Sequence, residues 1–177
     1  AIGLVGSEMC IRDSFKDTFS LYGFNALETP SMENINVLNG KYGEEGDKLI
    51  FRILDSGDFI KGVDNIESKD SNNLRKEISK KGLRYDLTVP FARYVVQHQN
   101  ELTFPFRRYQ IQPVWRADRP QRGRFQEFIQ CDADIVGNRS LWQEVEVLHL
   151  YDRIFNKLRL KDVNLRINHR NILVALI

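Results

Sequence analysis

The segment from Tyr109 to Val136 constrains the fold of this 177-residue chain more than any other part of it. It consists of two strand-like runs, Tyr109–Trp115 and Phe125–Val136, joined by a loop rich in arginine, proline and glycine. Neighbouring strands joined by a loop pair antiparallel, and one face of such a sheet needs a layer of helices. The sequence therefore predicts an α+β fold built on an antiparallel β-sheet flanked by helices.

The second run carries a polar face. Side chains at a spacing of two point to the same side of a strand. An amide and two carboxylates make a poor core surface, but they suit a polar, cationic ligand, so we expect this face to line a binding pocket. The residues of this face are Phe128, Gln130, Asp132 and Asp134.

The loop between the two runs holds four arginines within nine residues. Guanidinium groups so close together repel one another unless an anion lies among them, and the planar fork of arginine fits phosphate oxygens. The local pattern leaves two interpretations open, a solvated basic hairpin and a clamp for a polyphosphate or a nucleic-acid backbone. The loop arginines are Arg116, Arg119, Arg122 and Arg124, and Asp118 lies among them.

Two aromatic residues and one short segment add to this pattern. Phe125 and Phe128 are either strand core or stacking surfaces for a nucleobase, and Phe128 is the better stacking candidate because its face is polar. Asp86 and Thr88 follow a strand-like run and precede a helix, where side chains commonly project into a cleft. For Asp86 the alternative is a turn or capping residue.

Local patterns predict the remaining elements. An amphipathic helix ends at Tyr22 and is closed by Gly23. Thr88 is expected to cap a helix that has Pro90 in its first turn and runs to about Gln99. Another helix is expected over 140–158, short strands over 49–54, 83–87 and 163–167, and a polar surface insertion or mobile loop over 61–81.

Composition limits the function classes. The net charge is +2, so contact with a nucleic acid requires a local basic surface rather than bulk charge. Cys10 and Cys131 lie far apart without metal-ligand spacing, which predicts neither a disulfide framework nor a metal site. His98, His149 and His169 are interpreted as surface or packing residues. In the absence of a membrane-length apolar run or a convincing signal peptide, we expect a cytoplasmic protein.

The sequence at both ends of the chain is unusual. Residues 1–14 show no clear period and no sensible join to the helix that follows, so they are interpreted as a non-native linker or assembly scar. The apolar, helix-like run at 171–177 has no cap or stop signal. The chain is therefore expected to be truncated at both ends.

Several segments, in the right order, resemble the class II aminoacyl-tRNA synthetases and in particular the histidyl-tRNA synthetase family. Arg116-Ala-Asp118, a loop and then Arg124-x-x-x-Phe128-x-x-x-Asp132 resemble class II motif 2. Leu83–Arg93 is similar to the amino-acid-binding segment of the histidyl family, and Phe24–Glu33 resembles motif 1. The likeness covers residues 15–177, which it identifies as a partial, incomplete class II catalytic domain without motif 3 and the anticodon-binding domain.

The resemblance implies a role for each candidate residue. Arg116, the candidate catalytic residue, would bind the α-phosphate of ATP and the carboxylate of the amino acid. Arg124 would hold the terminal phosphates, Phe128 would stack on adenine, and Asp118 would face the adenine amine, where family members often carry glutamate. Magnesium is expected with the ATP. The implied histidine-binding residues are Asp86, Leu87, Thr88, Arg116, Gln130 and Asp134.

The resemblance also implies an activity and partners. The activity is the ATP-dependent activation of L-histidine to histidyl-adenylate, followed by transfer to the 3′ end of tRNA(His). A homodimer is implied through the motif 1 region, and the fragment alone is expected to be inactive.

Two alternatives stay open. One is a non-catalytic, histidine-sensing regulatory subunit of ATP phosphoribosyltransferase. The other is a nucleic-acid-binding hairpin with salt-sensitive RNA affinity, which leaves Asp86, Gln130 and Asp134 unexplained.

Overall fold

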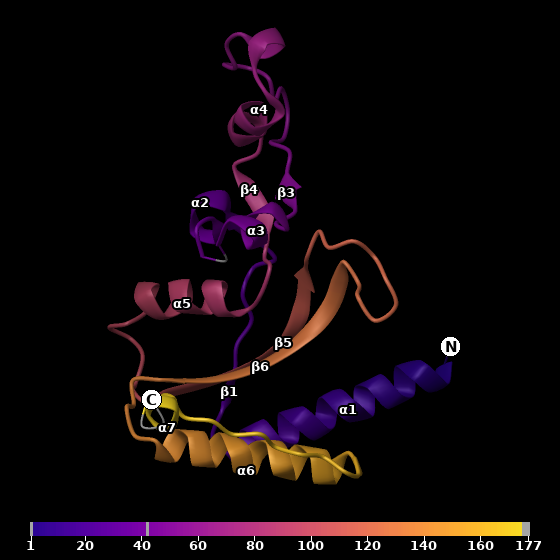
Figure 1. The fold of residues 1–177 in the computed structure, drawn as a ribbon, viewed down its shortest axis with the longest axis vertical. Helices are drawn as coiled ribbons and strands as arrows, with labels where there is room; N and C mark the ends of the chain where they lie inside the picture. The colour runs from indigo at the N-terminus through magenta and orange to yellow at the C-terminus, as the bar shows by residue number, and fades with distance from the viewer. Residues whose placement is uncertain (1, 42, 175–177) are drawn as a thin grey trace.

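The centre of the molecule is a long antiparallel strand pair. The computed structural model describes residues 2–41 and 43–174. Strands β5 (Phe106–Trp115) and β6 (Glu127–Val136) pair along their whole length. The two-residue strand β1 (Asn25–Ala26) pairs with β5 in parallel. Figure 1 shows β5 and β6 as a curved ribbon that runs across the molecule. The predicted antiparallel pairing is confirmed, but β6 begins at Glu127, so Phe125 belongs to the loop.

Two helices cover one face of this sheet. Helices α1 (Ile2–Leu21) and α6 (Trp142–Lys157) contact each other and lie below the strands in Figure 1. Their buried side chains pack onto odd-numbered strand residues, whose side chains share one face because of the strand period. The even-numbered face is therefore turned away from these helices. The core consists of Phe19, Phe24, Leu150 and Ile154, with Tyr109, Ile111, Ala133 and Ile135 packed against it.

Helix α1 ends where the sequence predicts. Gly23 has a φ of 74°, and the N–H of Phe24 donates to the carbonyl of Phe19 over 2.9 Å, which is the bond pattern of a glycine-closed helix. The start of the helix differs from the expectation, because residues 2–14 continue the same helix. Contacts four residues apart support this part, such as the ion pair of 2.9 Å between Arg12 and Glu8. The non-native origin of residues 1–14 stays a prediction.

A second small sheet carries an arm that projects from the body (Figure 1). Its strands β2 (Met32–Asn34), β4 (Lys81–Leu83) and β3 (Arg52–Ile53) lie in that order and pair antiparallel. Helices α2 (Ile35–Leu38) and α3 (Gly43–Lys48) follow β2. The strand predicted over 49–54 is shorter than expected, since only Arg52 and Ile53 pair with β4.

The polar stretch 61–81 is not a plain loop. It contains a 3-10 turn (Ile66–Ser68) and helix α4 (Ser71–Ile78). Asp70 starts α4, since its Oδ1 accepts from the N–H groups of Asn72 and Asn73 over 2.8 and 3.0 Å. No residue of α4 is buried, so the surface insertion is confirmed for this helix, whereas the alternative of a mobile loop was wrong for residues 71–78.

Helix α5 (Thr88–Gln97) lies across the sheet from α1 and α6 (Figure 1). Pro90 is in its first turn, as predicted, but Thr88 is not its cap. The preceding residue Leu87 already has helical dihedral angles, and Asp86 Oδ1 accepts from the N–H of Val89 over 3.1 Å. The side chain that caps α5 is therefore that of Asp86, and not that of Thr88.

The C-terminal part departs from the expectation once. Residues 163–167 form no strand: they are exposed and pair with no strand of the described chain. Helix α6 begins at Trp142, whose N–H donates to Ser140 Oγ over 3.3 Å. Helix α7 (Arg170–Val174) matches the predicted helical run, and 175–177 lie outside the described residues. A membrane-spanning helix is absent from the described part of the chain.

Candidate functional site: an acidic sheet face beside an arginine-lined cavity

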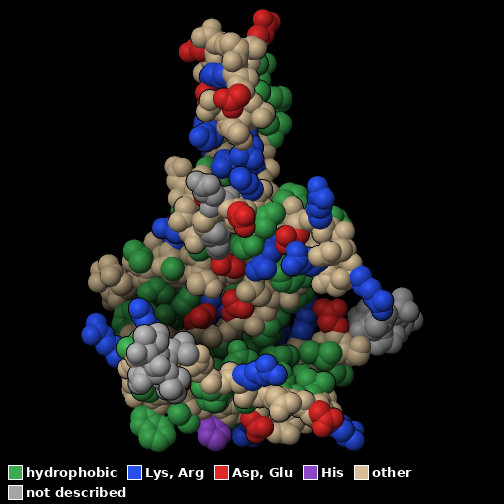
Figure 2. Space-filling view, in the orientation of Figure 1, with side chains coloured by type: hydrophobic (Ala, Val, Ile, Leu, Met, Phe, Trp, Pro, Cys, Tyr) green, Lys and Arg blue, Asp and Glu red, His purple; other side chains and the backbone are tan. Residues whose placement is uncertain are grey.

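The sheet face turned away from α1 and α6 is polar. The cross-strand register places Arg108 opposite Asp134, Gln110 opposite Asp132 and Gln112 opposite Gln130. The predicted common face of the even-numbered residues of β6 is therefore confirmed, and β5 contributes polar residues to it as well. Figure 2 shows acidic side chains in a hollow between the regions of α5 and α6.

Carboxylates outnumber cations on this face. Arg108 is fully buried, and its Nη2 lies 2.6 Å from Oδ2 of Asp134. Burial lowers the pKa of Arg108, and Asp134, Asp132 and Asp86 raise it, so all three carboxylates act on one guanidinium. Burial raises the pKa of Asp132, Arg108 lowers it, and Asp134 and Asp86 raise it further. An excess of negative charge in a partly buried place suits a cationic group of a ligand.

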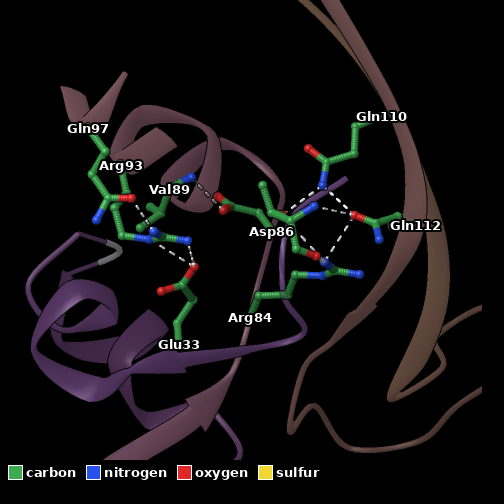
Figure 3. Close-up of polar contacts among 9 residues, drawn as sticks. Glu33, Arg84, Asp86, Val89, Arg93, Gln97, Gln110 and Gln112 are labelled. Atoms are coloured by element: carbon green, nitrogen blue, oxygen red, sulfur yellow. Dashed lines mark hydrogen bonds and ion pairs between the residues drawn. The ribbon is translucent and has the colours of Figure 1, made fainter. Parts of the chain in front are cut away.

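Asp86 lies between two polar networks, as Figure 3 shows. On one side, Arg93 of α5 is paired with Glu33 of β2. On the other side, the buried Arg84 donates from Nη1 to the carbonyl of Thr29 over 2.6 Å and to Gln112 Oε1 over 3.1 Å. The segment that carries Asp86 is thereby anchored both to β5 and to the chain before β2. The capping alternative for Asp86 is confirmed, and its ligand role stays a prediction.

A cavity of about 470 Å³ opens at the loop end of the sheet. Its volume lies in the range of small-molecule sites. Of the four loop arginines, Arg116 and Arg124 line it, whereas Arg119 and Arg122 are exposed outside it. The residues predicted to contact ATP all line this cavity: Arg116, Asp118, Arg124 and Phe128. The other lining residues are Tyr85, Gly123 and Phe125.

Arg116 is held in place by backbone and aromatic contacts. Its guanidinium lies 4.4 Å from the ring centroid of Tyr85 and 5.1 Å from that of Phe128. Its Nε donates to the carbonyl of Tyr85 over 3.2 Å, and its N–H donates to the carbonyl of Gln126 over 2.8 Å. A cation over an aromatic face is stabilised by the ring quadrupole. Because one face of Phe128 meets Arg116, a stacked base would use the other face.

The predicted histidine-binding residues Leu87 and Thr88 differ in their surroundings. Leu87 is fully buried, and its carbonyl accepts from Arg108 Nη2 over 3.4 Å. Thr88 is exposed at the start of α5. The structure brings Asp86, Gln130 and Asp134 to the polar face, and the binding roles of all these residues stay predictions.

Sequence reasoning missed two residues of this region. Arg108 precedes the run that we started at Tyr109, yet it shares the spacing of two with Gln110 and Gln112, and this spacing was the available signal. Tyr85 lies beside Asp86 in the segment that we singled out, but nothing in the local pattern links its ring to Arg116.

The fold identifies the class of protein. The crystal structure of histidyl-tRNA synthetase from Nostoc sp. PCC 7120 matches with a TM-score of 0.73 and 30% identity, over 96% of this chain and 34% of that chain. An ATP phosphoribosyltransferase regulatory subunit/histidyl-tRNA synthetase from Bacillus halodurans matches with a TM-score of 0.66 over 89% of this chain and 35% of that chain. At 22% identity, the second match shows the fold alone. The fold is that of the class II aminoacyl-tRNA synthetases.

Sequence comparison identifies the family within this class. The histidyl-tRNA synthetase family model matches residues 74–177, and the chain belongs to this family. The histidine–tRNA ligase of Christiangramia forsetii is 62% identical over 165 residues, which are 92% of this chain and 36% of that protein. The chain thus spans about a third of the length of the curated relatives that it matches.

Proposed function

We propose that this chain forms the part of a histidine–tRNA ligase that binds L-histidine and ATP. The observation that carries the proposal is the adjacency of two unlike surfaces on one sheet. The acidic face holds Asp132 and Asp134, and the cavity beyond the same strand is lined by Arg116 and Arg124. One surface suits a cationic amino acid and the other suits a polyphosphate, and the activation reaction needs both side by side.

The acidic face is proposed as the histidine pocket. Asp86 lies near the face and provides a carboxylate for the α-ammonium group of the amino acid, with Thr88 beside it on the chain. Gln130 and Asp134 offer hydrogen-bond acceptors for the imidazole ring. An apolar side chain of the same shape would leave these polar groups unpaired, at a cost of about 1–3 kcal/mol for each.

The arginine-lined cavity is proposed as the ATP site. Arg116 and Arg124 bind the phosphates, Phe128 stacks on adenine, and Asp118 faces the adenine amine. No group of three or more His, Cys, Asp or Glu side chains in the described chain is placed to hold a metal ion. Magnesium is proposed to accompany the ATP phosphates.

The proposed chemistry depends on positioning and on charge. The carboxylate oxygen of histidine attacks the α-phosphorus of ATP, a P–O bond forms, and pyrophosphate leaves with the electrons of the broken bond. Arg116 neutralises charge on the α-phosphate, and its anchoring to Tyr85 and Gln126 keeps the guanidinium aimed before the substrates arrive. In a second step a hydroxyl of the terminal tRNA adenosine takes the histidyl group from AMP.

The proposal also covers partners and location. We propose that tRNA(His) is the acceptor and that the protein forms a homodimer through the motif 1 region at Phe24–Glu33. We also propose a cytoplasmic location. Residues 15–177 would form the motif 1 and motif 2 part of the catalytic domain.

Histidine-dependent exchange of pyrophosphate into ATP tests the proposal. The protein is expressed from the complete reading frame that contains this chain, and each of the other amino acids serves as a control. We expect exchange with histidine alone and no exchange by the 177-residue chain by itself. Histidine binding without any exchange by the complete protein would favour the regulatory subunit, and strong, salt-sensitive RNA binding by the short chain would favour the hairpin.

A further inference from the structure

Arg108 is an unusual component for the wall of a ligand pocket. Its side chain is fully buried, and its guanidinium lies 4.2 Å from the ring centroid of Phe91 on α5. Its Nη2 donates to the carbonyl of Leu87 over 3.4 Å. The guanidinium is thus held by a ring and by a backbone carbonyl, so it has little freedom to turn.

The closest charged neighbour of Arg108 is Asp134. Nη2 and Oδ2 are 2.6 Å apart, but the contact does not have the angles of a hydrogen bond, so it is a close ion pair rather than a directed bond. Within 2–41 and 43–174, the buried Nε and Nη1 of Arg108 have no hydrogen-bond partner either. Burying a cation with unmet donors opposes folding, and an apolar side chain of similar size would pack without this cost.

The preceding residue shows what a purely structural arginine does in this strand. Arg107 points to the opposite face, where both of its terminal nitrogens bind the carboxylate of Glu146 on α6. Its guanidinium also lies 5.7 Å from the ring centroid of Phe24 in the core. Arg107 therefore ties a helix to the sheet, whereas Arg108 contacts a carboxylate of the polar face.

We propose that Arg108 is a positioning residue for the amino-acid substrate, which holds the carboxylate of Asp134 at the place where it receives an N–H of the imidazole ring. The inference rests on the proposed function and adds to it a residue that touches no substrate. Phe91 and Leu87 fix the guanidinium, and the guanidinium pairs with the carboxylate of Asp134 on β6. The position of this carboxylate therefore depends on the position of α5. Loss of Arg108 leaves Asp134 present but free to turn away.

The test compares Arg108→Met with Arg107→Met in the protein from the complete reading frame. The KM values for histidine and for ATP are measured separately by pyrophosphate exchange. Arg108→Met should raise the KM for histidine about ten- to hundredfold and leave the KM for ATP within about twofold, as expected for loss of one charge-assisted contact. Arg107→Met should lower the melting temperature without a selective change in the KM for histidine.

Two more variants separate positioning from charge and from folding. Arg108→Lys keeps the charge with a single nitrogen, and it should recover part of the affinity for histidine. Arg108→Met combined with Asp132→Asn restores the charge balance of the face, and it should not recover this affinity. Full recovery in this double variant would mean that Arg108 acts through charge alone, which overturns positioning.

The outcomes distinguish the two proposals. An unmodified protein without histidine-dependent exchange overturns the proposed function, and the role of Arg108 with it. An active protein in which Arg108→Met leaves the KM for histidine unchanged overturns the role of Arg108 alone. If Arg108→Met does not fold, Arg108→Lys decides, because equal effects on the KM values for histidine and ATP would contradict a selective role.

Discussion

The carboxylate of Glu33, nearly buried on β2, is held by two nitrogens of Arg93 on α5. Nε and Nη2 of Arg93 lie 3.1 and 2.7 Å from the same Oε1 (Figure 3). The pair joins the small sheet to the helix that begins at the candidate histidine pocket. Its integrity therefore bears on the position of Asp86 at the start of α5.

The first prediction concerns this pair. Arg93→Ala should lower the free energy of unfolding by about 2–3 kcal/mol, because it leaves the Glu33 carboxylate nearly buried without its charged partner. Urea denaturation followed by circular dichroism measures the change. Gln97→Ala is the matched control, since Gln97 accepts from Nη1 of the same arginine at the surface, and it should cost less than about 0.5 kcal/mol. Equal losses in the two variants would contradict the prediction.

The second prediction is a dependence of stability on pH through Glu146. The hydrogen bonds from Arg107 lower the pKa of Glu146 below its ordinary value of 4.5. A lowered carboxyl pKa stabilises the fold above the ordinary pKa, and this contribution is lost as the pH falls through the folded pKa. Both side chains are partly exposed, at 21% and 31%, so solvent screening limits the effect to about 1 kcal/mol.

Arg107→Met provides the measurement for Glu146. The difference in unfolding free energy between the unmodified chain and this variant should shrink as the pH falls below 4.5. Added salt near neutral pH should reduce the same difference. A difference that stays constant across the acid range would show that Arg107 contributes by packing on Phe24 and not through the ion pair.

The third prediction concerns the reactivity of Cys131. Burial and the nearby Asp132 raise the pKa of this thiol to about 11, although part of the residue is exposed. Near pH 8 roughly one thiol in a thousand is then ionised, and iodoacetamide should react with it roughly a hundredfold more slowly than with free cysteine. A Cys10→Ser variant isolates the signal. The rate should keep rising toward pH 11, and a plateau near the range of an ordinary thiol would refute the shift.

The fourth prediction separates two tasks of Asp86. Asp86→Asn keeps an oxygen that can accept from the N–H of Val89, so the stability should change by less than about 0.5 kcal/mol. It removes the negative charge, so the KM for histidine in the complete protein should rise about tenfold or more. Asp86→Ala removes both features and should cost about 1 kcal/mol in addition. If Asp86→Asn keeps the affinity for histidine, Asp86 serves as a helix cap only.

Much of the central strand pair and the end of α1 could be predicted from the sequence. The spacing of two on β6 predicts that Gln130, Asp132 and Asp134 share a face, since strand geometry alone sets this alternation. The closure of α1 at Gly23 is equally local, because it depends on the backbone freedom of one glycine. The strand predicted over 163–167 was wrong, because these residues pair with no strand of the described chain and strand propensity depends on such pairing.

The sequence by itself determined which residues alternate on β6, where α1 ends and which loop concentrates the arginines. Only the tertiary structure decided that Arg108 is buried against Asp134 while Arg107 turns to Glu146, and that Tyr85 joins Phe128 around Arg116. The reason is physical. Alternation and helix closure depend on neighbouring residues, whereas burial and ion pairing depend on α5, α6 and the strands meeting across long separations in the chain.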